Sequence, residues 1–238
     1  MRLRLLPALC LGLLLQSGPC RAADDPRFTV MAVDPASEQL GLFLTDDSGE
    51  PFKRFEALEA WLGHRGKTLR FAMNAGMYHA DFSPVGLLVI DGKERAPLNL
   101  REGSGNFFLK PNGVFLLAGG AARVVESGAY PALAQAQAIR LATQSGPLLL
   151  QHGAIHPAFN PASTSKLIRN GVGVANGKAL FVISEVPVNF YEFALYFRDV
   201  LHCQDALYLD GVVSTLHVPG MKRPGIRTEL GPLIGVLR

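Results

Sequence analysis

Two carboxylates stand where strand-like segments end, which is a common location for residues that carry out chemistry. Asp210 follows the apolar run 206–209 and precedes Gly211, and Glu185 follows the run 180–184. A carboxyl group in such a place can move a proton to or from a ligand, or attack it. We therefore predict Asp210 as the first catalytic carboxylate and Glu185 as the second. An aspartate-glycine pair is also typical of an ordinary turn at the end of a strand.

Arg169 is the cation best suited to an anionic ligand. Its guanidinium is planar and permanently charged, so it can hold two oxygens of one phosphate. Gly171 and Gly173 follow it closely and would let the side chain reach inward. Lys166 and Arg169 together also fit a solvated charged face, so both interpretations stay open.

Short polar residues and glycines interrupt several other strand-like runs. Glycine lets a ligand approach the backbone and leaves N–H groups available for an anion. Tyr78 offers an aromatic face for a ligand ring, and His79 can carry a proton near neutral pH. Each of these residues alone is also typical of a turn. The predicted substrate-binding residues are Asn74, Gly76, Tyr78, His79, Ser145, Gly146, Arg169, Gly211, Ser214 and Thr215.

Other catalytic patterns are incomplete. His152 and His156 have the spacing of a zinc-binding helix, but a glycine and a proline in the same segment oppose a helix. Ser145 lacks the glycines that flank the nucleophile of an α/β-hydrolase. Cys203 lies in an apolar setting that is more typical of a core residue than of a nucleophile. We predict no metal site and no cofactor.

The first 22 residues have the pattern of a secretory signal peptide, with two arginines, an apolar run and then small residues. The run of roughly ten apolar residues is too short to cross a bilayer, which needs about twenty. Cys20 would be the acceptor in a lipoprotein, but Gly18 and Pro19 before it make a poor lipidation site. We expect cleavage after Ala22, no membrane span in the mature chain, and export to the periplasm or beyond.

The leader accounts for the excess of basic residues. It contains three of the 23 lysines and arginines and none of the 20 aspartates and glutamates, so the remaining chain has equal numbers of both. No basic run marks a nucleic-acid contact. Only Cys203 remains well beyond the leader, so no internal disulfide is expected, and the core alone must hold the fold.

Two helices are predicted from the spacing of apolar residues. Apolar residues recur along 190–201 at intervals of three and four, and Asn189 and Glu192 stand where an N-cap and its capping-box partner belong. This predicts a helix that runs from there to about residue 202. The second predicted helix covers residues 54–62 and places its apolar side on a sheet.

Short strands make up most of the remaining predicted elements. Asp91-Gly92 and Asn176-Gly177 each separate two apolar runs and favour tight hairpins, so at least part of the sheet should be antiparallel. With no linker or repeat, we expect residues 23–238 to form one α+β domain with a mixed, largely antiparallel sheet and a few packed helices. The predicted strands cover residues 28–33, 40–44, 69–73, 85–90, 114–117, 180–184 and 206–209.

Six short stretches, taken in order, resemble the phosphodiester glycosidases, and in particular a bacterial branch of small exported proteins. The resemblance extends from about Phe28 to the C-terminus and so covers one whole domain. Each stretch is unspecific by itself, but six in the same order are hard to obtain by chance. They are 71–79, 83–87, 106–113, 143–147, Arg169 with Gly173, and 208–211.

The resemblance implies an enzyme that hydrolyses a sugar-1-phosphodiester, for example one of N-acetylglucosamine, in a cell-envelope glycan or glycolipid. Asp210 and Glu185 would then flank the anomeric carbon, with Arg169 on the phosphate. A carboxyl separation of about 5 Å would favour retention of configuration, and roughly 6.5 to 9.5 Å would favour inversion. The alternative is a noncatalytic envelope protein that binds glycan or phosphate in the same cleft.

The chain departs from the family pattern at two places. Ala75 stands where the family usually has a glycine, and Val212 and Val213 stand in a run that is usually glycine-rich. Valine restricts the backbone to negative φ and adds bulk. These valines are expected to narrow the pocket or to change which donors face the ligand.

Overall fold

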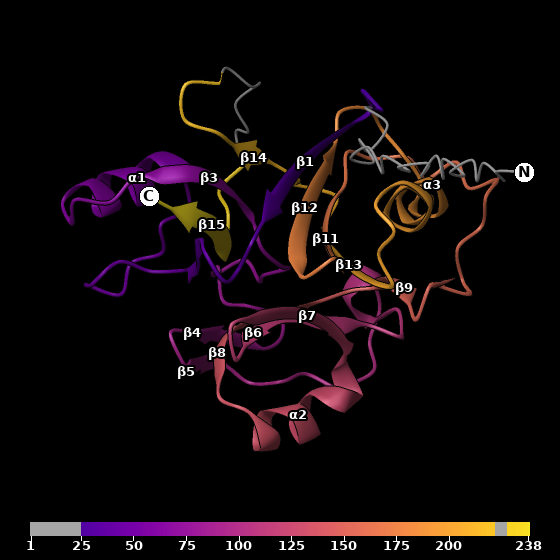
Figure 1. The fold of residues 1–238 in the computed structure, drawn as a ribbon, viewed down its shortest axis with the longest axis horizontal. Helices are drawn as coiled ribbons and strands as arrows, with labels where there is room; N and C mark the ends of the chain where they lie inside the picture. Colours follow the sequence, from indigo (N-terminus) through magenta and orange to yellow (C-terminus); the bar gives the residue numbers. More distant parts are fainter. Residues whose placement is uncertain (1–24, 222–227) are drawn as a thin grey trace, which may run out of the picture.

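The computed structural model describes residues 25–221 and 228–238, so the predicted leader 1–22 lies outside the described residues. In the described part of the chain the strands form three sheets, and every strand pairing is antiparallel. Figure 1 shows one sheet with helix α2 below the other two sheets, which stand side by side. The predicted α+β class with largely antiparallel pairing is confirmed, with the strands divided among three sheets.

The largest sheet has six strands and carries the predicted catalytic carboxylates at one end. Its neighbouring strands β12 and β11 are joined by the predicted Asn176-Gly177 hairpin, whose two residues have positive φ values of 51° and 73°. In spatial order the strands are β1 (Phe28–Val33), β12 (Lys178–Ser184), β11 (Asn170–Ala175), β13 (Asp205–Asp210), β9 (Leu148–Gln151) and β10 (Ala154–Ile155).

The other two sheets complete the framework. The four-stranded sheet has the order β14 (Leu216–His217), β3 (Leu69–Asn74), β15 (Leu233–Leu237) and β2 (Gln39–Phe43). The five-stranded sheet has the order β5 (Lys93–Ala96), β4 (Leu88–Ile90), β8 (Ile139–Ser145), β6 (Gly113–Ala118) and β7 (Ala121–Glu126). The predicted Asp91-Gly92 hairpin joins β4 to β5, again with positive φ at both residues.

Each helix covers the outer face of one sheet. Helix α1 (Phe55–Gly63) packs on the four-stranded sheet, α2 (Tyr130–Ala136) on the five-stranded sheet and α3 (Phe190–Leu195) on the six-stranded sheet. The capping box predicted for α3 is present, because Asn189 Oδ1 accepts from Glu192 N at 2.8 Å and Glu192 Oε2 accepts from Asn189 N at 2.8 Å. After Leu195 the helix continues as a π-helix, η3 (Tyr196–Val200), a widening that the spacing did not predict.

The inner faces of all three sheets share one hydrophobic core. Phe71 of β3, Phe115 of β6 and Phe181 of β12 are fully buried and contact one another through Phe181, with ring centroids 5.8 and 5.5 Å apart. A common core is what a single domain requires. No helix in residues 25–221 or 228–238 is long and apolar enough to cross a bilayer.

One predicted strand is shorter than expected. The run 85–90 pairs as a strand only over Leu88–Ile90. Upstream of it, the backbone N–H of Val85 donates to Met77 O at 3.0 Å, and that of Leu87 donates to the side chain of Gln144 at 3.0 Å. These bonds divert the chain out of the sheet, and this leaves Val85 beside the pocket described below.

Candidate active site

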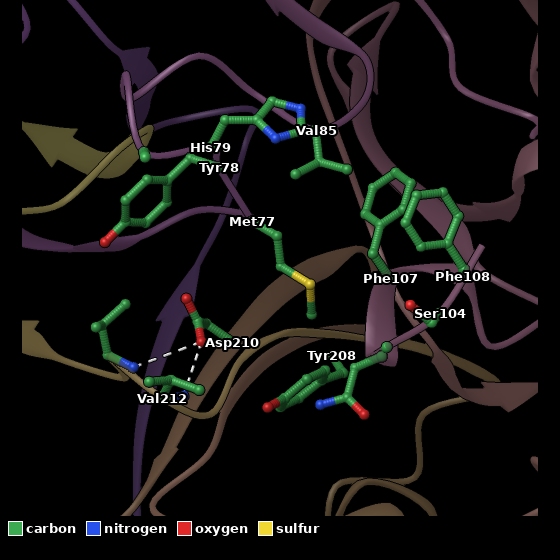
Figure 2. Close-up of a pocket in the computed structure, with 14 residues that line it drawn as sticks. Met77, Tyr78, His79, Val85, Ser104, Phe107, Phe108, Tyr208, Asp210 and Val212 are labelled. Atoms are coloured by element: carbon green, nitrogen blue, oxygen red, sulfur yellow. Dashed lines mark hydrogen bonds between the residues drawn. The ribbon is translucent and has the colours of Figure 1, made fainter.

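A pocket of about 530 Å³ lies between three segments that are far apart in the sequence. The first is the loop after β3, the second is the segment leading into and including the 3₁₀ turn η1 (Asn106–Phe108), and the third is the end of β13 with the turn that follows. Figure 2 shows how their side chains surround it. The lining residues are Met77, Tyr78, His79, Ala80, Val85, Ser104, Gly105, Asn106, Phe107, Phe108, Tyr208, Asp210, Val212 and Val213.

Asp210 is the single aspartate or glutamate among the described lining residues. Its Oδ1 accepts hydrogen bonds from the backbone N–H groups of Gly211 at 2.5 Å and Val212 at 2.9 Å, while Figure 2 shows the other oxygen pointing into the pocket. Burial raises the pKa of this carboxyl above its ordinary value, and the hydrogen bonds from the turn partly oppose that shift. The turn therefore holds one oxygen and leaves the other directed into the pocket.

Tyr208 lies two residues before Asp210 and on the same side of β13, because side chains alternate along a strand. Its ring packs edge-on against Phe190, with centroids 4.7 Å apart. Burial raises the pKa of the Tyr208 hydroxyl well above its usual value, although the positive charge of Arg169 acts in the opposite direction. The hydroxyl is therefore protonated at neutral pH and able to donate a hydrogen bond.

Arg169 lies beneath the pocket and is not part of its lining, which differs from the expectation of a side chain reaching inward to a phosphate. It is only 1% exposed. Nε donates to Val188 O at 2.9 Å and Nη2 to Ser165 O at 3.0 Å, and the guanidinium carbon lies 3.8 Å from the centroid of the Phe190 ring. Its Nη1 donates to the hydroxyl of Tyr208 at 3.3 Å. Arg169 is thus connected to the pocket through its hydrogen bond to Tyr208, which lines the pocket.

The buried charge of Arg169 has no carboxylate partner within the described residues. Burial lowers the pKa of its guanidinium, and the contact with Tyr208 raises it again. A buried cation without an anion is costly to a fold. Here the guanidinium is satisfied by two backbone carbonyls and by the Tyr208 hydroxyl, which is the group that connects its charge to the pocket.

Gly211 is required for space. A Cβ at this position would lie 1.9 Å from the Tyr208 hydroxyl oxygen and 3.3 Å from Nη1 of Arg169. No real Cβ contact is that short, so any side chain would displace the tyrosine. Gly211, which the sequence predicts as a ligand contact, is not among the lining residues, and its missing side chain lets the hydroxyl of Tyr208 lie under the turn.

A buried polar network holds the turn after Asp210. Asn74, at the end of β3, accepts hydrogen bonds through Oδ1 from the side chain of Asn170 at 2.9 Å and from the backbone of Thr215 at 2.9 Å. The hydroxyl of Ser214 donates to Asp210 O at 2.7 Å. Three predicted substrate-binding residues, Asn74, Ser214 and Thr215, therefore meet beside the pocket and support Asp210 without lining the cavity.

Glu185 is not brought into the pocket. Its side chain is exposed and accepts a hydrogen bond from the hydroxyl of Thr29. Asn170 pairs with both Asp210 and Ile183, so the strand that leads to Glu185 is two strands away from Asp210, roughly 10 Å at the usual strand spacing. The two carboxylates that the sequence pairs as catalytic groups do not share a cavity.

The remaining predicted residues divide between the lining and its support. Tyr78 and His79 line the pocket, although the Tyr78 hydroxyl donates away from it, to Glu229 O at 2.6 Å. Gly76 lies beneath the same loop, where a Cβ would come within 2.9 Å of Thr143 Oγ1.

Ser145 and Gly146 support the pocket from behind. The hydroxyl of Ser145 donates to Leu209 O at 2.9 Å and so ties β8 to β13. A Cβ on Gly146 would lie 2.8 Å from Phe107 O, so the absent side chain lets the η1 turn pack closely.

The two valines that depart from the family pattern have different surroundings. Val213 is 8% exposed and packs in the core cluster on the α1 side of the four-stranded sheet. Val212 is 87% exposed at the pocket. Neither is among the described residues with positive φ, so the turn does not require glycine's backbone freedom here.

Sequence reasoning missed much of the lining. Tyr208 could have been found, because alternation along β13 places it beside Asp210. Asn106, Phe107 and Phe108 belong to the stretch 106–113 that carries the family resemblance, but no local spacing places them at the pocket, because their position depends on how η1 packs against Gly146. Within residues 25–221 and 228–238, no three His, Cys, Asp or Glu side chains are grouped so as to hold a metal ion.

The family model described as phosphodiester glycosidase matches residues 67–236, which include all of the pocket-lining residues. The chain belongs to the phosphodiester glycosidase family. This family member is also 37% identical over 220 residues to the uncharacterized protein YigE of Escherichia coli K12, covering 91% of this chain and 85% of YigE.

Solved structures share the fold of this phosphodiester glycosidase family member. The catalytic domain of zebrafish N-acetylglucosamine-1-phosphodiester alpha-N-acetylglucosaminidase, auto-inhibited by its pro-peptide, has a TM-score of 0.54 at 16% identity, with 88% of each chain covered. A hypothetical protein from Synechocystis has a TM-score of 0.55 at 16% identity, covering 88% of this chain and 59% of that longer one. At these identities the likeness concerns the fold alone.

Proposed function

We propose that this pocket hydrolyses a sugar-1-phosphodiester, with Asp210 as the catalytic carboxylate. The observation that carries the proposal is the buried carboxylate of Asp210, with one oxygen held by the turn and the other directed into a pocket of about 530 Å³. A pocket of this size accommodates a sugar and its phosphate. Membership of the phosphodiester glycosidase family supports the same chemistry.

Asp210 acts as a general base in this proposal. Its oxygen in the pocket takes a proton from water, whose oxygen bonds to the anomeric carbon while the bond from that carbon to the phosphate oxygen breaks. The electron pair leaves with the phosphate monoester, which is a good leaving group and needs little acid assistance. With one carboxylate among the described lining residues, a single displacement with inversion fits better than a double displacement, which needs a second acid or base.

Tyr208 and Arg169 supply the phosphate contact. No lysine or arginine is among the described lining residues, so the charge of a bound phosphate needs another source of stabilisation. Arginine is only a donor, so the Tyr208 oxygen accepts from Arg169 and its own proton is available for a phosphate oxygen. Tyr208 is then the binding residue and Arg169 the positioning residue behind it. The signal-peptide pattern of residues 1–22 supports an exported enzyme that acts on an envelope glycan or glycolipid.

The test is turnover of an N-acetylglucosamine-1-phosphodiester by the mature protein, followed by mass spectrometry of the released sugar. Asp210→Asn keeps an oxygen for the turn and removes the base, so we expect a loss of about 10²- to 10⁴-fold. Glu185→Gln is the matched control outside the pocket and should keep wild-type activity. Full activity of the Asp210→Asn variant would overturn the assignment. Saturable glycan binding without product release by the wild type would instead favour the noncatalytic alternative.

A further inference from the structure

Val212 has a position that neither packing nor backbone geometry explains. Its backbone N–H donates to Asp210, but its side chain is 87% exposed and belongs to none of the core clusters of the described residues. The neighbouring Val213 is buried in the core. A single exposed valine is common on protein surfaces, but this one lines the pocket next to Asp210 and therefore lies where it can contact a ligand.

The pocket has one polar corner and a mainly apolar remainder. Asp210, Tyr208 and Asn106 form the polar corner. Across from Asp210, Figure 2 shows Val85 and the phenylalanines of η1, with the Met77 side chain extending into the space between. A sugar phosphate needs the polar corner. His79 and Ser104 add two polar side chains to the rest of the lining, and its apolar part, which includes Met77, Val85 and Val212, suits a group without hydrogen-bonding atoms.

We propose that the alcohol on the far side of the scissile phosphate is apolar, a lipid-like or alkyl aglycone, and that Val212 together with Met77 contacts it and sets this specificity. The inference rests on the proposed function, because it places the sugar phosphate against Asp210. Burying a valine side chain against an alkyl group is expected to change kcat/KM by about tenfold.

The experiment compares methyl and octyl esters of N-acetylglucosamine-1-phosphate as substrates of the mature protein. Wild type should have a kcat/KM about tenfold higher for the octyl ester. Val212→Thr keeps the branched shape and adds a hydroxyl, so the octyl-to-methyl ratio should fall toward one. The matched control is Val186→Thr, the same change at a 42% exposed valine outside the pocket, and it should leave the ratio as in wild type. A wild-type ratio near one, or an unchanged ratio in Val212→Thr, overturns the inference.

A binding measurement separates this inference from the proposed function. The corresponding methyl and octyl C-glycosyl phosphonates cannot be cleaved, and their affinities for the same three proteins can be measured by calorimetry. One possible outcome is that neither ester is hydrolysed, that the octyl phosphonate binds wild type about tenfold more tightly than the methyl one, and that only Val212→Thr loses this preference. That outcome would support the apolar contact and contradict the proposed hydrolysis. Equal affinities of the two phosphonates for wild type would contradict the proposed apolar contact, whether or not the protein hydrolyses the esters.

Discussion

Nη1 of Arg169 donates a hydrogen bond to the Tyr208 hydroxyl at 3.3 Å, directly beneath the turn that begins at Gly211. The phenolic oxygen accepts, because a guanidinium has no lone pair to offer. A buried positive charge is therefore one hydrogen bond away from the pocket, and a phosphate bound there would be stabilised through Tyr208. This relationship can be tested independently of the role of Asp210.

Tyr208→Phe should lower kcat/KM for a sugar-1-phosphodiester by about 10- to 100-fold, the usual cost of a lost hydrogen bond to a charged group. The phenylalanine ring keeps the packing against Phe190, but Nη1 of the buried Arg169 loses its acceptor, so the fold should also be destabilised by about 1–3 kcal/mol and the melting temperature should fall. Steady-state kinetics and thermal unfolding on the same preparations measure both effects. Wild-type kinetics in this variant would remove Tyr208 from the site.

Arg169→Lys should lower kcat/KM in the wild-type background and have little further effect in Tyr208→Phe. The reason is that Arg169 acts through the hydroxyl that the second variant lacks, so the two losses are not additive. A double-mutant cycle on kcat/KM measures the coupling. If the two losses simply add, Arg169 has a structural role independent of Tyr208.

Gly211→Ala should abolish most activity while leaving the core intact. The added Cβ would lie 1.9 Å from the Tyr208 hydroxyl oxygen, so the ring must move and leave Arg169. Removing that oxygen in Tyr208→Phe relieves the overlap, so Gly211→Ala should cost much less activity in the Tyr208→Phe background. Equal losses in both backgrounds would show that the glycine matters for another reason.

Asp210→Asn should become more stable relative to wild type as pH rises. An unfolded aspartate titrates near about pH 4, and burial raises the folded pKa of Asp210 above that value. Between the two pKa values the folded state binds more protons than the unfolded state, so this group's contribution to stability is present at low pH and lost as pH rises through the folded pKa. Asparagine does not titrate. Urea unfolding of both proteins from pH 4 to 8 measures the difference, which should grow and then level off; a constant difference would contradict burial of the charge.

Gln144→Leu should destabilise the fold by about 3 kcal/mol, because it leaves several buried groups unpaired. The Gln144 side chain accepts from Leu87 N at 3.0 Å and Asn99 N at 2.9 Å, and donates to Asn99 O at 2.8 Å and Ser127 Oγ at 3.0 Å. Thr143→Val, which removes one hydrogen bond at the adjacent position, is the control and should cost about 1 kcal/mol. Urea unfolding monitored by circular dichroism measures both, and equal costs would contradict the role of Gln144 as a multiple bridge.

Local sequence patterns were sufficient to predict several structural elements. The strand 28–33, the two hairpin turns and the capping box of Asn189 and Glu192 were predicted and are present. These features depend on interactions between residues close in sequence, so side-chain type and spacing carry the information. The same holds for the position of Asp210 at the end of a strand.

The sequence alone thus determined the α+β class, the family and the carboxylate at the end of β13. Only the tertiary structure decided what that carboxylate meets. Strand order placed Glu185 two strands away and outside the pocket, and close packing placed Arg169 under Tyr208 instead of in the lining. Such relationships depend on contacts between segments that are far apart in the sequence, as in the bond from Thr215 to Asn74, whose residues are 141 positions apart. The spacing of residues along the sequence does not predict these contacts, because they form only when the sheets pack against each other.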